Sequence, residues 1–416
     1  MIIYIGLVLL FTNFMSYVGP GWNYILGTRI SRIFLLILIL PVVVMNSTKF
    51  PRTTLYKCCM WLMTFAFISM IGAYALHDQS FMQSFMVTSP ALTFLMFPFM
   101  YILKIDEKSL IKLCFFLGLV WVVIMFVQQF TYPTYYFCNA GYHERGGPGM
   151  RNGIVRYGTA GGVYGLLMLF YAFQKYLEEG KRKYLVWIII GLIGVYLTCT
   201  RQIIAASAGC LLVGLYLKGK MKVGAFIGIL LIGLVIYHYS DALFGEYSEM
   251  TENDLGGGDE YVRITAYRFF GLTYNKDNLF AILFGNGMNY GDTSKYGVEF
   301  TRYGTQYGLN LNDIGYVGEY FIYGLIYVLI VFYTFYYVFK NRKYISLYLL
   351  LYELYMLTTG IMLMHFACYS VGIYGTIMVW YLIDLDIAKN KRKINSRQLK
   401  QQKGGYANNR SYNPQL

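Results

Sequence analysis

Long apolar runs without polar alternation recur along the chain. Segments such as "AFIGILLIGLVIY" (225–237) and "YGLIYVLIVFYTFYYVF" (323–339) contain no charged residue, and at least nine segments are of this kind. Each approaches the roughly 20 apolar residues that a helix needs to cross the hydrocarbon of a bilayer. A transmembrane β-barrel would instead show alternating segments of about 10 residues. The pattern therefore predicts an all-α, polytopic integral membrane protein.

The apolar runs predict twelve transmembrane spans. We expect a membrane domain over 1–386, which includes an outward loop subdomain over 240–313 between the ninth and tenth spans, and a basic cytoplasmic tail over 387–416. The predicted spans are 1–18, 30–46, 56–77, 84–103, 109–130, 157–176, 184–200, 202–217, 222–239, 314–339, 344–365 and 367–386.

The positions of Lys and Arg set the orientation of these spans. With the N-terminus inside, 24 of the 35 Lys and Arg residues fall in or beside the inward loops and the tail. The positive-inside rule places such an excess on the cytoplasmic side. The tail, "KNKRKINSRQLKQQK", is expected to be a solvated or lipid-surface extension. The inward loops are 47–55, 104–108, 177–183, 218–221 and 340–343.

The kind of cation differs between the two sides. The formal net charge of +14 alone would suggest nucleic acid, but the cations are sorted by membrane side, so we expect no nucleic-acid partner. The outward set has nine arginines and two lysines, whereas the inward set has six arginines and eighteen lysines. Because the guanidinium group binds phosphate bidentately, this bias indicates a phosphate-bearing ligand outside; chance, or ion pairs with outward acids, is the alternative. The outward arginines are Arg29, Arg32, Arg145, Arg151, Arg156, Arg201, Arg263, Arg268 and Arg302.

Two patterns that often mark metal or nucleotide sites do not indicate such a site in this sequence. Six of the seven cysteines lie in or beside apolar spans, which excludes a disulfide framework, and no spacing suggests a metal site. The segment "GNGMNYG" (285–291) lacks the GxGxxG spacing and the surrounding βαβ unit of a nucleotide loop. It predicts a sharp turn that returns the outer loop to the membrane.

Arg201 is the one charge in the apolar run from 184 to 217. A single helix of that length would measure about 51 Å, against a hydrocarbon thickness of about 30 Å. Two short spans fit better, so Arg201 marks a tight outward hairpin. The simple explanation of how its charge is tolerated is that the side chain snorkels, extending its guanidinium group to the membrane interface. Its neighbours Thr198, Thr200 and Gln202 favour a polar cavity with an anionic occupant.

The outward loop and the span after it supply further candidates. In "EYVRITAYRFF", Arg263 and Arg268 are five residues apart, so a helix does not place them on one face. In "LNDIGYVGEYFIYG", Asn312 and Asp313 stand at the start of an apolar helix. Asp313 could act as a general base there, or it could only cap the N-terminus of the helix. Tyr290 is one of several outer tyrosines suited to stacking on sugars, or equally to an interfacial aromatic belt.

These motifs resemble those of the O-antigen polymerase and ligase superfamily, the Wzy-like polysaccharide polymerases. The resemblance rests on "TCTRQIIAA", "YVRITAYRFF…LFGNGMNYG" and "LNDIGYVGEYFIYGLIYV", and covers roughly residues 150 to 340. It implies a membrane glycosyltransferase of the bacterial inner membrane, without cofactor or metal, whose active site faces the periplasm or the cell exterior. The implied partners are a polyprenyl-diphosphate-linked oligosaccharide, membrane lipid, a chain-length regulator and a flippase.

The resemblance also implies roles for individual residues. Arg201 and Arg263 match the arginines that hold the diphosphate, and Asp313 falls where the ligases carry a histidine thought to act as base. The aspartate suits a polymerase better than a ligase. Arg151 and Arg156 match more loosely. The expected reaction joins a growing glycan to a lipid-linked repeat unit with inversion, and the two rival functions are an O-antigen ligase and a lipid-linked oligosaccharide flippase.

Overall fold

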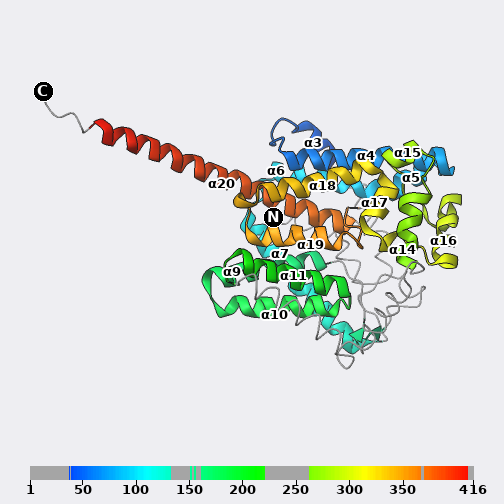
Figure 1. The fold of residues 1–416 in the computed structure, drawn as a ribbon, viewed down its shortest axis with the longest axis horizontal. Helices are drawn as coiled ribbons and strands as arrows, with labels where there is room; N and C mark the ends of the chain where they lie inside the picture. Colours follow the sequence, from blue (N-terminus) through cyan, green and yellow to red (C-terminus); the bar gives the residue numbers. More distant parts are fainter. Residues whose placement is uncertain are drawn as a thin grey trace.

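Helices form most of the described part of the computed structural model, which describes residues 37, 39–132, 150–151, 154–155, 161–220, 262–366 and 370–410. The helices of the bundle run side by side along its long direction (Figure 1). Those before residue 220 are α3 (Leu40–Met45), α4 (Thr54–His77), α5 (Phe81–Thr88), the 3-10 segment η4 (Ser89–Leu95), α6 (Met96–Ile102), α7 (Glu107–Thr131), α9 (Gly162–Glu179), α10 (Arg182–Leu197) and α11 (Arg201–Leu217).

The second half continues with shorter elements and then the closing helices. They are α14 (Val262–Arg268), the π-turn η6 (Phe269–Thr273), α15 (Leu279–Phe284), η7 (Gly291–Thr293), α16 (Lys295–Tyr307), η8 (Leu311–Asp313), α17 (Gly315–Tyr323), α18 (Leu325–Lys340), η9 (Arg342–Tyr344), α19 (Leu347–Thr359) and α20 (Ser370–Arg410). The predicted spans 1–18 and 222–239 and the first part of the outward loop, 240–261, lie outside the described residues.

Three helical stretches of the described chain are long and apolar enough to cross a membrane: Thr54–His77, Phe81–Ile102 and Glu107–Thr131. Their outer faces carry large exposed apolar side chains, for example Phe116 and Phe130 of α7, which are 61% and 75% exposed. Such continuous apolar faces suit lipid tails and are rare on proteins surrounded by water. The chain is thus consistent with a helical membrane protein, while the count of twelve spans stays a prediction.

Two expectations about regular structure need correction. The predicted span 314–339 is divided into α17 and α18 at Gly324, whose φ is +85° and where a Cβ atom would lie 2.3 Å from the carbonyl oxygen of Leu283. Only glycine fits this close backbone approach. The chain is also not purely helical, because β1 (Met150–Arg151) pairs antiparallel with β2 (Ile154–Val155).

The predicted inward loops meet at one end of the bundle, which we call the inner end. Near the point where α20 leaves the bundle, Asp384 accepts hydrogen bonds from Thr53 and from Tyr101, the latter at 2.9 Å. Asp386 accepts the backbone N–H of Ser346 at 2.8 Å. These contacts bring together three connections, before α4, after α6 and before α19, that are far apart in sequence.

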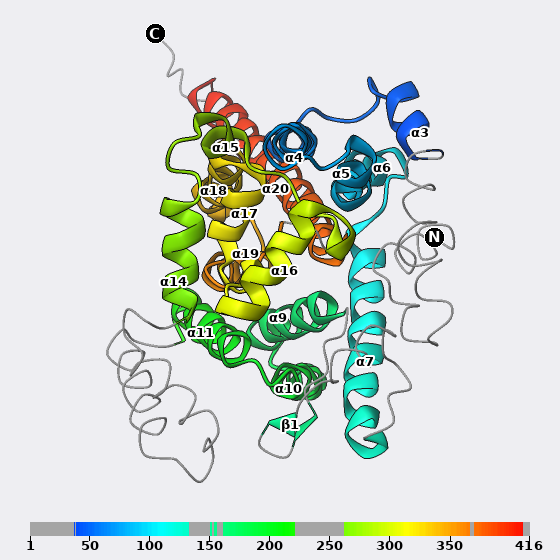
Figure 2. The same ribbon diagram turned by 90° about the vertical axis from the view of Figure 1, so that its right-hand side faces the viewer.

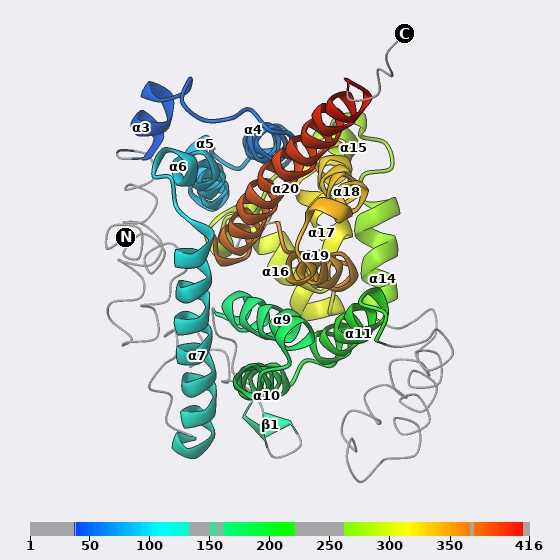
Figure 3. The ribbon, with the colours of Figure 1, turned by 90° about the vertical axis from the view of Figure 1, so that its left-hand side faces the viewer.

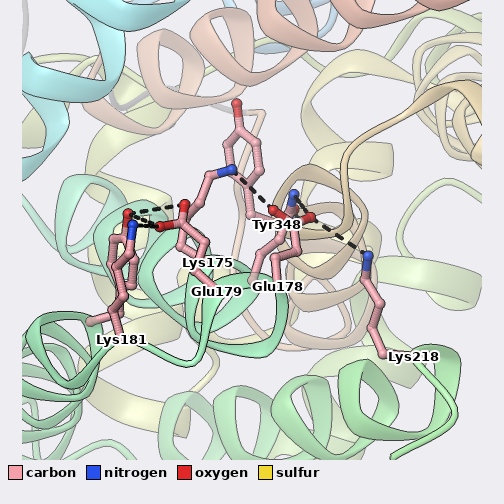
Figure 4. Close-up of polar contacts among 8 residues, drawn as sticks. Lys175, Glu178, Glu179, Lys181, Lys218 and Tyr348 are labelled. Carbon is pink, nitrogen blue, oxygen red and sulfur yellow. Dashed lines mark hydrogen bonds and ion pairs between the residues drawn. The ribbon is translucent and has the colours of Figure 1, made fainter.

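The remaining inward loops join the same end through Glu178, near the C-terminus of α9 (Figure 4). Its carboxylate accepts a hydrogen bond from Gln174 at 2.8 Å and pairs with Lys175 at 3.0 Å and with Lys218, just after α11, at 3.6 Å. Gln174 in turn accepts the backbone N–H of Tyr348 in α19 at 2.8 Å. The prediction that all five loops share one side of the bundle is therefore confirmed, while their orientation in a membrane stays a prediction.

Candidate functional site

The turn that carries Arg201 forms as predicted. α10 ends at Leu197 and α11 begins at Arg201, so three residues make the turn, and Cys199 takes a left-handed φ of +48°. Lys218 at the other end of α11 is held at the inner end. Seventeen helical residues span about 25 Å. Half-buried Arg201 therefore lies at the opposite, outer end of the bundle.

A pocket at the outer end brings two of the predicted catalytic residues together. Arg263, in the first turn of α14, and Asp313, at the end of η8, line the same open pocket, whose volume is about 100 Å³. Figure 2, which looks onto this end, shows α14 at the edge of the bundle beside α11 and α17. The lining residues are Val262, Arg263, Ala266, Gly308, Asn310, Asp313 and Ile314.

Contacts with the connection between α19 and α20 hold Arg263 in place. Its guanidinium donates to the sulfur of Met362 at 3.6 Å, and one turn later the hydroxyl of Tyr267 donates to the carbonyl of Ile361. Arg268 is exposed and does not line the pocket. The sequence argument that Arg263 and Arg268 occupy different helix faces is therefore confirmed.

Asp313 presents its carboxylate at the pocket instead of capping the helix. The N-cap residue of α17 is Ile314, and no side-chain bond caps that helix. Asp313 is exposed, and within the described part of the chain its carboxylate forms no hydrogen bond or ion pair. A carboxylate in this position can accept a proton, and the nearby guanidinium can neutralise an anionic group.

Asn310, and not the predicted Asn312, lines the pocket. Asn312 is exposed, because the 3-10 turn of η8 directs successive residues to different sides. Asn310 precedes that turn, and its amide makes a long hydrogen bond, 3.4 Å, to the carbonyl of Gly308. Asn310 follows Gly308, whose φ is +67°, and this backbone conformation is decided by the fold.

The glycine-rich segment 285–291 is a structural turn. Gly285 and Gly287 have φ values of +83° and +71°, and a Cβ atom on Gly285 would lie 2.2 Å from the carbonyl oxygen of Ile322. The backbone N–H groups of Asn286 and Gly287 donate to carbonyls of α17 at 3.0 and 2.9 Å. The prediction of a sharp turn is confirmed.

Gln79, which sequence reasoning missed, anchors the end of this turn. Its buried side-chain amide donates to Ser84 at 3.0 Å and to the carbonyl of Met288 at 2.8 Å. Its oxygen accepts the backbone N–H of Tyr290 at 2.7 Å and the hydroxyl of Ser294 at 3.3 Å. The backbone of Tyr290 is thus part of the scaffold, and its half-buried ring does not line the pocket.

Other outer tyrosines form an aromatic cluster with α4 and α17. The ring of Tyr296 stacks on His77 with centroids 3.9 Å apart and is buried, so it is closed to a sugar. Tyr303 donates to Glu299 at 2.7 Å. Burial, followed by hydrogen bonding to the Glu299 carboxylate, raises the pKa of Tyr303. Tyr303 therefore stays a neutral donor.

Of the two predicted arginines before α9, Arg151 and Arg156, the structure describes only the backbone of Arg151. Arg151 lies on the small hairpin, which is held by Gln129 of α7 through two hydrogen bonds to Val155, at 2.8 and 3.1 Å. Figure 3 shows β1 beside α10, with α11 between it and α14. Arg29, Arg32, Arg145 and Arg156 lie outside the described residues.

The described residues contain no group of three or more His, Cys, Asp or Glu side chains that could hold a metal ion. No protein-family model, curated protein or solved structure matches this chain. Any function must therefore be argued from the pocket and from the arrangement of the helices.

Proposed function

We propose that this protein is a polysaccharide polymerase of the bacterial inner membrane, which transfers a growing glycan from a polyprenyl-diphosphate carrier to a lipid-linked repeat unit. The observation that carries the proposal is the shared pocket of Arg263 and Asp313, at the end of the bundle opposite the basic loops. In the orientation of the positive-inside rule, this pocket faces the periplasm or the cell exterior.

The pocket supplies the two groups that such a transfer needs. An acceptor hydroxyl oxygen bonds to the anomeric carbon while the bond from that carbon to the diphosphate oxygen breaks. Asp313 takes the hydroxyl proton, and Arg263 neutralises the charge that develops on the leaving diphosphate. Arg201 acts on the diphosphate from the same end of the bundle. Direct displacement inverts the anomeric centre, and the lipid diphosphate provides the driving force.

The surroundings of α14 suit a lipid-linked substrate. Val262, Ile264 and Leu272 on α14 and η6 are 45%, 37% and 73% exposed. Val262 and Ile264 are the sequence neighbours of Arg263, and α14 lies at the edge of the bundle, where lipid tails would lie in a membrane (Figure 2). A polyprenyl chain in the bilayer can therefore bring its diphosphate to Arg263 without leaving the hydrocarbon.

Reconstitution in vesicles with a defined polyprenyl-diphosphate oligosaccharide tests the proposal. We expect a ladder of polymer products from the native protein and a loss of at least about a hundredfold in rate from Asp313→Asn, because the base is removed. Asp277→Asn is the matched control, since Asp277 is an exposed outer carboxylate that does not line the pocket. A normal ladder from Asp313→Asn, or carrier transport without polymer, would contradict the proposal, and inhibition by a chelator would contradict its metal-independent mechanism.

A further inference from the structure

The carboxylates at the inner end are already occupied by protein partners. Asp106 accepts the backbone N–H of Ser109 at 2.9 Å and its hydroxyl at 2.6 Å. Glu107, Glu178 and Glu179 each pair with a lysine, at 3.2, 3.0 and 2.8 Å. Most other exposed cations of this end form no ion pair among the described residues, and the remaining inner carboxylates, Asp384 and Asp386, are buried and already accept hydrogen bonds.

Two of these cations converge on one ring where η9 meets α20. The ammonium groups of Lys343 and Lys391 lie 4.9 and 5.4 Å from the centroid of the Tyr344 ring. The carbonyl of Tyr344 accepts the side-chain amide of Asn390 at 2.7 Å, which fixes the first turn of the tail against η9. Both lysines are exposed and form no ion pair within the described chain. The one carboxylate that acts on Lys391 from within the described chain, Asp384, is buried, so an anion bound beside the Tyr344 ring would be attracted by both ammonium groups.

The distance from the bundle distinguishes these cations from those farther along the tail. α20 is buried as far as Ile387, so Lys391 lies only about 6 Å beyond the buried part. Lys400 and Lys403 lie about 20 to 24 Å beyond it, on the part of α20 that leaves the bundle (Figure 1). Since electrostatic attraction is largely screened beyond a Debye length of about 8 Å at physiological salt, Lys400 and Lys403 lie too far along α20 to act strongly on an anion bound beside Tyr344.

We propose that the junction of η9 and α20, built around Tyr344, binds the headgroup of an anionic phospholipid in the leaflet at the inner end. The ring and the Asn390 bond hold Lys343 and Lys391 in place, and the headgroup phosphate supplies the missing negative charge. This site requires the chain to span a membrane, but it does not depend on glycosyl transfer at the opposite end.

The test compares two double variants of the full chain purified in a neutral detergent. Short-chain phosphatidylglycerol or phosphatidylcholine is added, and the apparent affinity is taken from the rise in unfolding temperature. For Lys343→Gln with Lys391→Gln, we expect phosphatidylglycerol to bind about thirtyfold more weakly, from about 1 kcal/mol per cation. The matched control, Lys400→Gln with Lys403→Gln, removes the same charges from the far part of α20 and should change the affinity less than about twofold.

Several results would overturn the assignment. An unchanged affinity in the first double variant would exclude the junction as the site. An equal loss of affinity in both double variants would indicate that the charge of the whole tail matters and not one site, as would be expected for an acidic protein partner. Equal binding of phosphatidylcholine, or equal protection by inorganic phosphate alone, would exclude an anionic lipid. If the first double variant does not fold, Lys391→Gln alone should still weaken binding about fivefold.

Discussion

The two ends of the helix bundle differ in how they use polar groups, although some outer carboxylates, such as Glu299 with Tyr303, are also paired within the protein. At the inner end, aspartates and glutamates are tied to lysines, hydroxyls and backbone amides that join distant loops, as in the Glu178 cluster (Figure 4). At the outer end, neutral amides such as Gln79 hold the scaffold together, while the carboxylate of Asp313 stays exposed in a pocket with Arg263.

This difference separates structural polar groups from groups available for chemistry. A carboxylate that already accepts several hydrogen bonds contributes to stability, but it is poorly placed to take a proton from a substrate. An uncommitted carboxylate beside a cation is free to do so. The comparison therefore predicts large effects on activity at the outer pocket, and effects on stability elsewhere.

The largest effect is expected at Arg263. Arg263→Ala should lower the initial rate of chain extension by about a hundredfold to a thousandfold, because it removes a cation from the site where charge develops on the leaving group. The measurement is the rate of ladder formation in reconstituted vesicles. Arg268→Ala on the same short helix is the control and should stay within about threefold of the native rate, because Arg268 lies outside the pocket. Equal losses of rate in both variants would show that a position in the pocket is no more important for activity than a position on the surface.

A smaller effect, on stability, is expected at Gln79. Gln79→Ala should destabilise the protein by about 3 kcal/mol, because it leaves buried partners such as the Tyr290 N–H and the Met288 carbonyl without hydrogen bonds. Thermal unfolding in detergent measures the loss. Gln306→Ala, at an exposed position of α16, should change stability by less than about 0.5 kcal/mol. A native unfolding temperature for Gln79→Ala would show that the outer scaffold is held by other contacts.

The smallest effect is expected at Glu178. Burial raises the pKa of this carboxyl, but hydrogen bonds from Lys175 and Gln174 outweigh burial, and the net pKa is lowered. The stability that the ionised Glu178 gives the fold is therefore fully present above pH 4.5, the ordinary pKa of a glutamate, and it is lost as the pH falls through the lowered pKa. Glu178→Gln should cost less than about 1 kcal/mol at neutral pH and weaken the acid dependence of unfolding. A loss comparable to that of Gln79→Ala would mean that the inner ion pairs are stronger than surface pairs normally are.

The sequence located several features because their causes are local. The turn before Arg201 follows from a run too long for one span, and the turn at 285–291 follows from its glycines. The separation of Arg263 from Arg268 follows from helical geometry. The break at Gly324 was missed, because it depends on the backbone of Leu283, which lies about 40 residues earlier in the chain.

Hydrophobic periodicity and charge placement by themselves determined that the chain is helical and which loops share a side. Both depend on how a segment partitions between water and lipid, which is set by the residues of that segment alone. Tertiary structure alone decided that Asn310 rather than Asn312 lines the pocket, that Gln79 anchors Tyr290, and that Lys343 and Lys391 meet at one ring. These outcomes depend on contacts between segments far apart in sequence, and such contacts leave no local pattern.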